Sequence, residues 1–508
     1  MTMPRRLALT RPGALPGTGA ALAFALALAC TAGAAVLGPA PAQAQDIAPV
    51  GEPIDVALRT GPLLPEEVLR SSLLTFPSIL EAFEREAAAR SDQLTADGAF
   101  DLMLRGDAFD RLTGFNDGGA VRAQVIQPLQ PFGAQVFGGY TLSNGRLPTS
   151  QSSFNSNEFG RFNIGALFSL LRDRDIDPRR FALEDSRLAT GQARLDVLLV
   201  QLNVQQEALR AYWRWVAAGE EIRVFEELLE IAEARQIGLT REVGEGARAR
   251  IALTENEQNL LRRRTLLEQA RRDLEIAANS LGFFLRDSSG RMIVPTREQL
   301  PDVAALEPIP PIGTMLAVPI NEVVQNRPEL QTFRLALERA ANRVELRRND
   351  LQPRLDANVE LATGVGPMGS PTGDTTGAAV GVTFSVPLQR REARGRLQRA
   401  EAELRETELR QRRIADQITT EVDNILANLS AALKLADLAD AEVTQANQMV
   451  QAERTRFRLG AGDFFLVNLR EETAANAQIS AIRADLAGRL AEASYNAATM
   501  NLSALGME

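Results

Sequence analysis

The side chains that could carry out chemistry in this sequence are mainly carboxylates and guanidinium groups. The chain has 508 residues but no histidine, and its one cysteine is Cys30, near the N-terminus. Without histidine the chain lacks the commonest general base and a frequent zinc ligand. The adjacent acids Glu471 and Glu472 could pair for acid–base work, but such pairs usually lie on a solvated helix face. We therefore expect no catalytic, cofactor-binding or metal-binding residues, and an enzyme is the weakest class.

The composition also limits the fold and the partners. Aromatic residues make up only 5% of the chain although 45% is hydrophobic, which is typical of long helices rich in alanine, leucine, glutamate and arginine. The formal net charge of −9 gives no basic footprint for nucleic acid. We expect long helices, and no nucleic acid as a partner.

Residues 1–44 have the pattern of a secretory signal peptide. Three arginines precede an apolar run at 20–29, and Ala42 and Ala44 supply small residues before a cleavage position. The alternative, a membrane anchor, fits less well because this apolar run is too short to span a bilayer comfortably. Cleavage would remove the three arginines and change the formal net charge from −9 to −12.

Cys30 is also a weak candidate for lipid attachment, because small and apolar residues precede it at Ala27–Ala29. The later cleavage position competes with it, and cleavage there would leave a chain without thiol or disulfide chemistry. After residue 44 no apolar run reaches 18 residues, the length expected of a transmembrane helix. Any membrane span would then have to be built from strands.

Two copies of one element order account for most of the chain. We expect a first repeat at 45–285, a proline-rich linker at 286–325 that cannot be one helix, and a second repeat at 326–508. Ser169 and Ser385 each lie 75 positions before a glycine, Gly244 and Gly460 respectively. The first repeat should contain a helix at 77–97, strands at about 100–171, and long helices at about 178–241 and 248–283. The second should contain a helix at 328–351, strands at 354–365 and 378–388, and long helices at about 390–458 and 463–505.

The predicted strands alternate apolar and polar residues with a period of two. This pattern fits strands of a membrane β-barrel with one face on lipid and the other on a wet lumen, or a soluble sheet with one buried face. The secretory signal, the repeated hairpin and the lack of another core for these faces favour the barrel. The residues predicted to face lipid are Phe162, Ile164, Phe168, Val359, Leu361, Val380, Val382 and Phe384.

The number of strands should be even, because the helices that flank each strand set lie on the same side of the membrane. Extra alternating stretches at 121–125 and 136–142 favour four strands in the first repeat and two in the second. A hairpin outside the barrel is the alternative for these stretches.

The predicted long helices exceed what one compact domain needs. Asp177 and Pro178 form a good helix start, and leucine or valine then recurs every seven residues from Leu195 to Val216. Ile418 and Val422 begin a similar pattern in the second repeat. The spacing indicates coiled-coil packing, but it does not distinguish a channel wall from a coiled-coil envelope scaffold without a pore.

The order of these elements over residues 65–506 resembles the outer-membrane efflux protein family, the TolC-like channels. The segments Val382–Leu388 (VTFSVPL) and Arg456–Gly462 (RFRLGAG) are similar to that family. The resemblance implies a homotrimer in outer-membrane lipid, with one closed β-barrel and a coiled-coil α-barrel in the periplasm. Six strands from each of three chains would give eighteen strands in this barrel, rather than the twelve of the simplest family pattern. It also implies a periplasmic adaptor, an inner-membrane transporter and passive export in a tripartite efflux or type I secretion system. An adaptor itself would carry one helical hairpin, whereas this chain has two.

The resemblance places functional roles at two glycine turns. Adaptor-facing turns would contain Val243, Gly244, Gly246, Leu459, Gly460 and Gly462, although turn geometry alone would also explain these glycines. Family members often have aspartates just after the second turn, where this chain has Leu466 and Leu469. A partly apolar constriction is therefore an alternative to an acidic gate. The candidate constriction residues are Asp463, Leu466, Asn468, Leu469 and Glu471.

Overall fold

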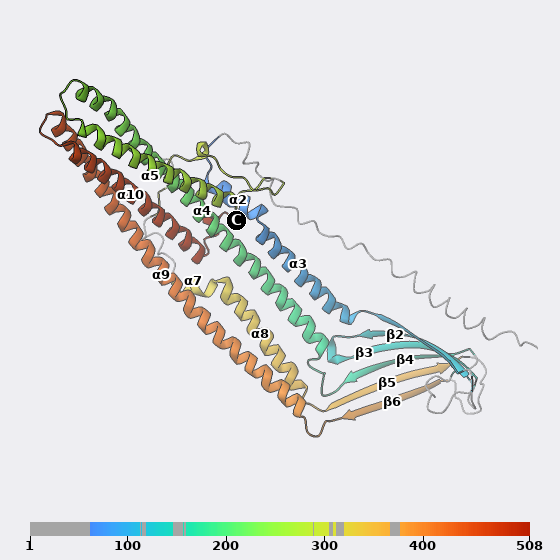
Figure 1. The fold of residues 1–508 in the computed structure, drawn as a ribbon. Helices are drawn as coiled ribbons and strands as arrows, with labels where there is room; N and C mark the ends of the chain where they lie inside the picture. The colour runs from blue at the N-terminus through green and yellow to red at the C-terminus, as the bar shows by residue number, and fades with distance from the viewer. Residues whose placement is uncertain are drawn as a thin grey trace, which may run out of the picture.

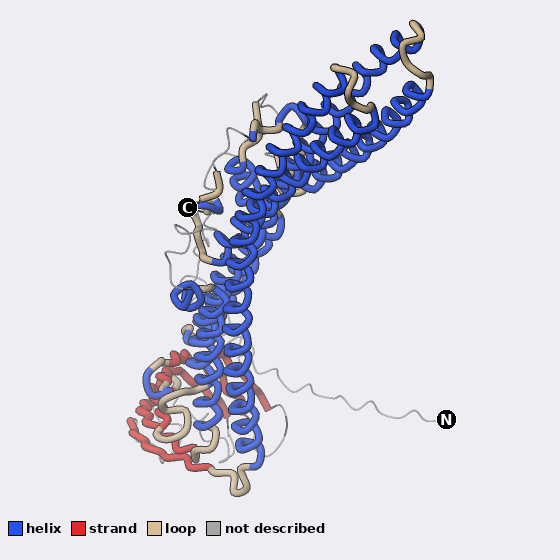
Figure 2. Tube along the Cα trace, turned by 90° about the vertical axis from the view of Figure 1, so that its left-hand side faces the viewer, coloured by secondary structure: helices blue, strands red, loops and turns tan. Residues whose placement is uncertain are grey.

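The protein is an elongated molecule with long helices at one end and an antiparallel sheet at the other (Figure 1). The computed structural model describes residues 61–507 except 112, 114–117, 146–155, 157–158, 288, 304–307, 311–319 and 366–375. Residues 1–44, including Cys30, lie outside the described residues. Figure 2 shows the helical rod bending between the sheet and the two hairpin tips.

Four main helices belong to the first half of the chain. They are α2 (Pro65–Thr75), α3 (Pro77–Asp97), α4 (Pro178–Gly244) and α5 (Ile251–Gly282). The 67 residues of α4 correspond to about 100 Å of helix. Its start is fixed locally, because the Asp177 carboxylate accepts hydrogen bonds from two backbone amides of the first turn at 2.8 and 3.0 Å.

The second half repeats this order. Its helices are α7 (Ile320–Asn326), α8 (Pro328–Asn349), α9 (Arg391–Arg458) and α10 (Phe464–Ala498). The helices α4 and α5 form one antiparallel hairpin, α9 and α10 form the other, and α4 also packs against α10 (Figure 1). Within the described residues, no helix combines the length and the apolar character needed to cross a membrane.

Six strands form one sheet in which every neighbouring pair is antiparallel and the spatial order follows the sequence. Four strands precede α4 and two precede α9, the numbers that the alternation favoured. The contact between β4 and β5 joins the two halves. The strands are β1 (Met103–Arg111), β2 (Gly118–Pro128), β3 (Gln135–Gly145), β4 (Arg161–Ser169), β5 (Arg354–Gly364) and β6 (Thr376–Ser385).

Apolar clusters between the helices hold the rod together. The largest surrounds Tyr212 and Trp215 of α4, both fully buried, with Leu281 and Leu285 from the end of α5. The Tyr212 hydroxyl donates a hydrogen bond to the backbone carbonyl of Leu63 at 3.0 Å. A second cluster packs α9 against α7 and α8. The helices therefore pack through their apolar faces and present mostly polar residues outside.

Several boundaries differ from the sequence expectations. The sequence does not predict α2, and α7 begins within the expected linker and ends one residue beyond it. Strand β6 ends at Ser385 rather than 388, because Pro387 has no amide hydrogen to continue the ladder. Helix α10 ends at Ala498 rather than near 505, since Met500 adopts a left-handed backbone conformation with φ of 57°.

Candidate functional site

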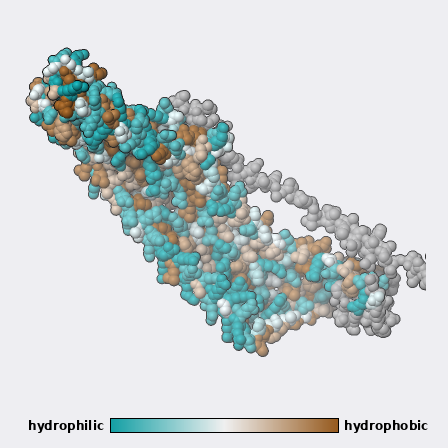
Figure 3. Space-filling view, in the orientation of Figure 1, coloured by the Kyte–Doolittle hydropathy of each residue, from teal (hydrophilic) through white to brown (hydrophobic). Residues whose placement is uncertain are grey.

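The strand register places large apolar side chains of the sheet on one face. Because paired residues of neighbouring strands project to the same side, Ala166, Val359 and Val380 share a face, and so do Phe168, Ala357 and Val382. All eight residues predicted to face lipid lie on this face, and their exposed fractions range from 37% to 76%. We call this surface the apolar face, and hydrophobic surface is visible over parts of the sheet in Figure 3.

The opposite side of the sheet, which we call the polar face, carries almost all of the strand charges. Following the register across all six strands, only Asp110 among the charged strand residues projects to the apolar face. The charged residues of the polar face are Arg105, Asp107, Arg111, Arg122, Arg161, Arg354, Asp356 and Glu360.

Hydrogen bonds and glycines organise the polar face. The Asn163 amide donates to the Glu360 carboxylate at 3.2 Å, and Asp356 accepts from Ser169 at 3.2 Å and from Arg354 at 2.6 Å. Glycine interleaves with these groups because a Cβ at Gly381 would lie 2.3 Å from the Asn358 side-chain oxygen. The face therefore combines polar groups with glycines whose missing side chains leave room for neighbouring polar side chains such as Asn358.

The two hairpin tips share one backbone motif. The amide of Gly246 donates to Val243 and that of Ala247 to Glu242, while Gly460 and Ala461 make the equivalent bonds at the second tip. Gly246 and Gly460 have φ of 73° and 78°, as this helix-ending motif requires. Structurally, Gly460 thus corresponds to Gly246, which corrects the pairing with Gly244 suggested by the equal spacing. Gly244 is the last residue of α4 instead.

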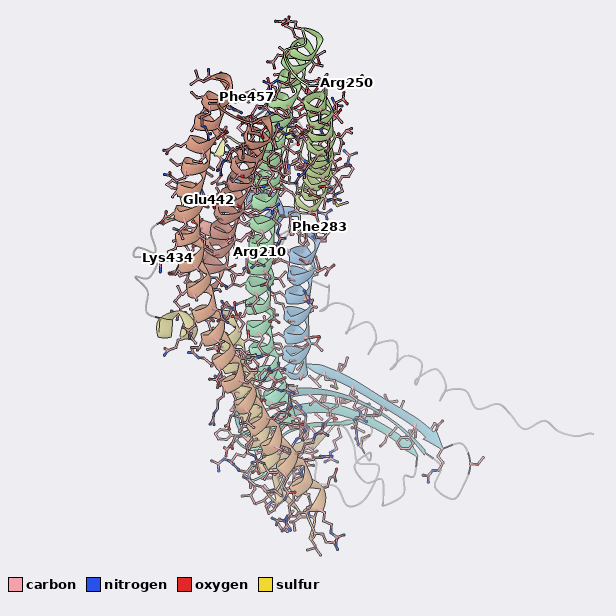
Figure 4. The ribbon with its side chains drawn as sticks, turned by 60° about the vertical axis from the view of Figure 1, so that its left-hand side comes forward. Arg210, Arg250, Phe283, Lys434, Glu442 and Phe457 are labelled. Carbon is pink, nitrogen blue, oxygen red and sulfur yellow. The ribbon has the colours of Figure 1, made fainter. Side chains whose placement is uncertain are left out.

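The tips are also packed against each other. Leu239, Ala252 and Phe464 form a small buried cluster from both hairpins, and the Arg248 guanidinium lies 4.8 Å from the centre of the Phe457 ring. Figure 4 shows Phe457 near the tip of the second hairpin and Arg250 at the start of α5. Leu459 is 78% exposed at the turn itself. The tips therefore present one joint end surface.

The candidate constriction residues separate into two groups. Asp463 caps α10 by accepting a hydrogen bond from the Phe465 amide at 3.2 Å, and Leu466 is half-buried. Leu469 is exposed, as is its neighbour on the same helix face, Phe465. Asn468 and Glu471 are buried inside the protomer, with 8% and 3% exposed. The expectation of a solvated helix face is therefore wrong for Glu471.

Glu471 of α10 is buried where α10 meets three other helices. Its carboxylate accepts hydrogen bonds from Arg235 of α4, from Arg263 of α5 at 3.1 Å, and from Arg454 of α9 at 2.9 and 3.0 Å. Arg235 also donates to the Asn468 side-chain oxygen at 2.6 Å. This Glu471 cluster links both hairpins, and its three guanidinium groups outnumber the one carboxylate.

The electrostatics of the cluster favour the ionised acid. Burial alone would raise the pKa of Glu471, but hydrogen bonds and Coulomb attraction from Arg235, with hydrogen bonds from the other two arginines, lower it below its usual range. Sequence analysis missed this cluster. A usable signal was present, because Glu471 falls on the buried stripe of α10 formed by Phe464, Val467 and Ala474.

Three comparisons with known proteins bear on this architecture. Residues 320–505 match the family model described as "Outer membrane efflux protein", which confirms the resemblance seen in the sequence over that part of the chain. No curated protein sequence matches the chain significantly. Among the described residues, no group of three or more His, Cys, Asp or Glu side chains could hold a metal ion.

Solved structures of outer-membrane proteins have a similar fold. The outer-membrane channel OprN is 16% identical with a TM-score of 0.62, over 86% of this chain and 89% of that one. VceC from Vibrio cholerae is 15% identical with a TM-score of 0.59, over 87% and 97%. The CmeC channel of Campylobacter jejuni is 13% identical with a TM-score of 0.61, over 87% and 89%. At these identities the likeness concerns the fold.

Proposed function

Starting from the match to outer membrane efflux proteins, we propose that this chain is one protomer of a trimeric outer-membrane export duct. The apolar face of the sheet would contact lipid, the polar face would line a water-filled lumen, and the long helices would form a tunnel in the periplasm. The chain would act without catalysis or a cofactor, and an inner-membrane transporter would supply the energy.

The distribution of side chains over the sheet is the observation that carries this proposal. Eight of the nine charged strand residues lie on one face, and large apolar residues are exposed on the other. A soluble sheet would cover its apolar face, whereas a membrane strand leaves that face to lipid. Among the described residues, no element packs across the exposed Val380, Val382 and Phe384.

The need for closure supports a trimer. Strands β1 and β6 are the two edges of the sheet, and their outer backbone groups have no partner strand among the described residues. Unpaired backbone groups are costly in hydrocarbon, so only a closed barrel can span a membrane with strands. Pairing β6 of one protomer with β1 of the next would close eighteen strands from three copies.

We assign roles to the tips and to the start of α10 from the family resemblance. We place the adaptor contact at the joint end surface that contains Leu459 and the turn glycines. We place the narrowest part of the tunnel near Phe465 and Leu469, because both are exposed on one face at the start of α10 and Leu469 stands where the family often has an acid. Asn468 and Glu471 would then lie inside the protomer next to the constriction rather than line it.

Reconstitution of the full-length protein tests this function. We expect heat-resistant trimers and single-channel currents in planar bilayers. Phe384→Glu on the apolar face should abolish insertion, whereas the matched variant Thr383→Glu on the polar face should still conduct. A monomer that neither inserts nor conducts would favour the alternative, a coiled-coil envelope scaffold without a pore. Export assays in a deletion strain would then identify the cargo.

A further inference from the structure

The polar face of the sheet has more positive than negative charges. Over the described strands it carries five arginines and three acids, which gives a formal charge of +2 per chain. The whole chain has a formal net charge of −9, so this face is positive although the chain as a whole is negative. Three copies around one lumen would bring the formal charge of this section to about +6.

The arginines lie in a defined pattern across the strands. The register aligns Asp107, Arg122, Thr141 and Arg161 in one row over β1 to β4. The Arg161 guanidinium lies 3.9 Å from the Glu360 carboxylate, and Arg354 contacts Asp356 near the helical end of the sheet. Arg105 likewise lies 3.5 Å from Asp107, so all three acids are held beside arginines, which reduces their attraction for cations in the lumen.

The last strand of the sheet, β6, adds no charge to the polar face. Strand β6 presents Gly377, Ala379, Gly381 and Thr383 to this side, so small or neutral residues stand where a second acidic row could compensate the arginines. Guanidinium groups stay protonated at every working pH, and the chain has no histidine that could change the balance near neutrality.

From this arrangement, and resting on the duct function proposed above, we infer that the strand section of the lumen prefers anions over cations. Rings of arginine or lysine select for anions in pores because they raise the local concentration of negative solutes and repel positive ones. The favoured permeants would be small anions and solutes that carry carboxylate, phosphate or sulfonate groups.

Reversal potentials of the reconstituted full-length channel test the inference. With a KCl gradient across a planar bilayer, the wild type should have a permeability ratio of chloride to potassium above one. Arg122→Glu changes the polar face from +2 to 0 per chain and should move the reversal potential toward zero. The matched control Asp110→Asn alters the lone charge of the opposite face and should leave the ratio unchanged.

The outcomes separate this inference from the proposed function. A wild type without any current would contradict the duct itself. Normal current with cation preference, or with a ratio insensitive to the arginines, would overturn only the anion preference. If Arg122→Glu fails to insert, Arg161→Gln provides the test instead. It removes one positive charge per chain and should shift the reversal potential less, but in the same direction.

Discussion

The helical rod and the sheet distribute their side chains in opposite ways. In the rod, Tyr212 and Trp215 are fully buried, and the outer surface is mostly polar with scattered exposed apolar residues such as Leu94 and Ile237. In the sheet, Val380 is 76% exposed and Phe384 is 62% exposed, while the charges face the other side. With the duct function proposed above, the difference would mean that one chain is built for two solvents, because exposed valine and phenylalanine are stable against lipid but not against water.

The largest effect should come from emptying the core of the rod. We expect Trp215→Ala to lower the free energy of unfolding by about 3–5 kcal/mol, because it removes a fully buried indole and leaves a cavity. Phe384→Ala in detergent should change it by only about 0.5 kcal/mol, since that ring is exposed. Thermal unfolding followed by circular dichroism would measure both, and equal losses would contradict the contrast between the regions.

The Glu471 cluster tests whether a buried charge can hold the two hairpins together. Glu471→Gln leaves three arginines around a neutral side chain and should cost about 3–5 kcal/mol of stability at neutral pH. The matched variant Glu472→Gln alters a more exposed pair with Arg262 and should cost at most about 1 kcal/mol. Unfolding experiments in denaturant would compare the two, and similar values would argue against a structural role for the buried cluster.

The same cluster predicts a pH dependence. Because the pKa of Glu471 is lowered in the folded state, its contribution to stability is present above the unfolded value of about 4.3. That contribution is lost as the pH falls through the lower, folded pKa. Wild-type melting temperatures should therefore drop in acid more steeply than those of Glu471→Gln. Parallel curves for the two proteins would contradict this account.

Substitutions on the two faces of the sheet test the same contrast between the regions. Val382→Arg would place a charge on the apolar face and should oppose bilayer insertion by about 2–4 kcal/mol if the residue lies near the midplane. Thr383→Arg, one residue along the same strand, projects to the polar face and should insert nearly as well as wild type. Folding into lipid vesicles, measured as heat-modifiable migration, would separate them, and equal insertion of both would exclude a lipid-facing surface.

The smallest effects are expected at the tip glycines, because a Cβ at Gly244 or Gly460 would meet nothing within 4 Å. Gly460→Ala should cost about 1 kcal/mol locally, because φ of 78° strains any residue with a Cβ. Gly244→Ala should be neutral or stabilising by about 0.5–1 kcal/mol, since that glycine is helical and a Cβ there would meet nothing within 4 Å. Amide hydrogen exchange at the tips would detect the difference, and greater protection in Gly460→Ala would refute it.

The sequence by itself determined the elements whose signals are local. Period-two alternation located the strands and the shared face of Phe162, Val359 and Val382, because side-chain direction in a strand depends only on parity. Asp177 and Pro178 located the start of α4, because a helix cap involves residues within one turn. The repeated order of elements indicated the family, since each helix and strand in that order has a signal of its own.

Only the tertiary structure decided what depends on contacts distant in sequence. Arg235, Arg263, Arg454 and Glu471 belong to four different helices, so neither the burial of the acid nor its arginine partners follows from any one segment. The same holds for the equivalence of Gly246 with Gly460 and for the row that joins Arg122 to Arg161. Spacing along the chain predicts direction within an element, whereas the packing of elements determines which charges meet.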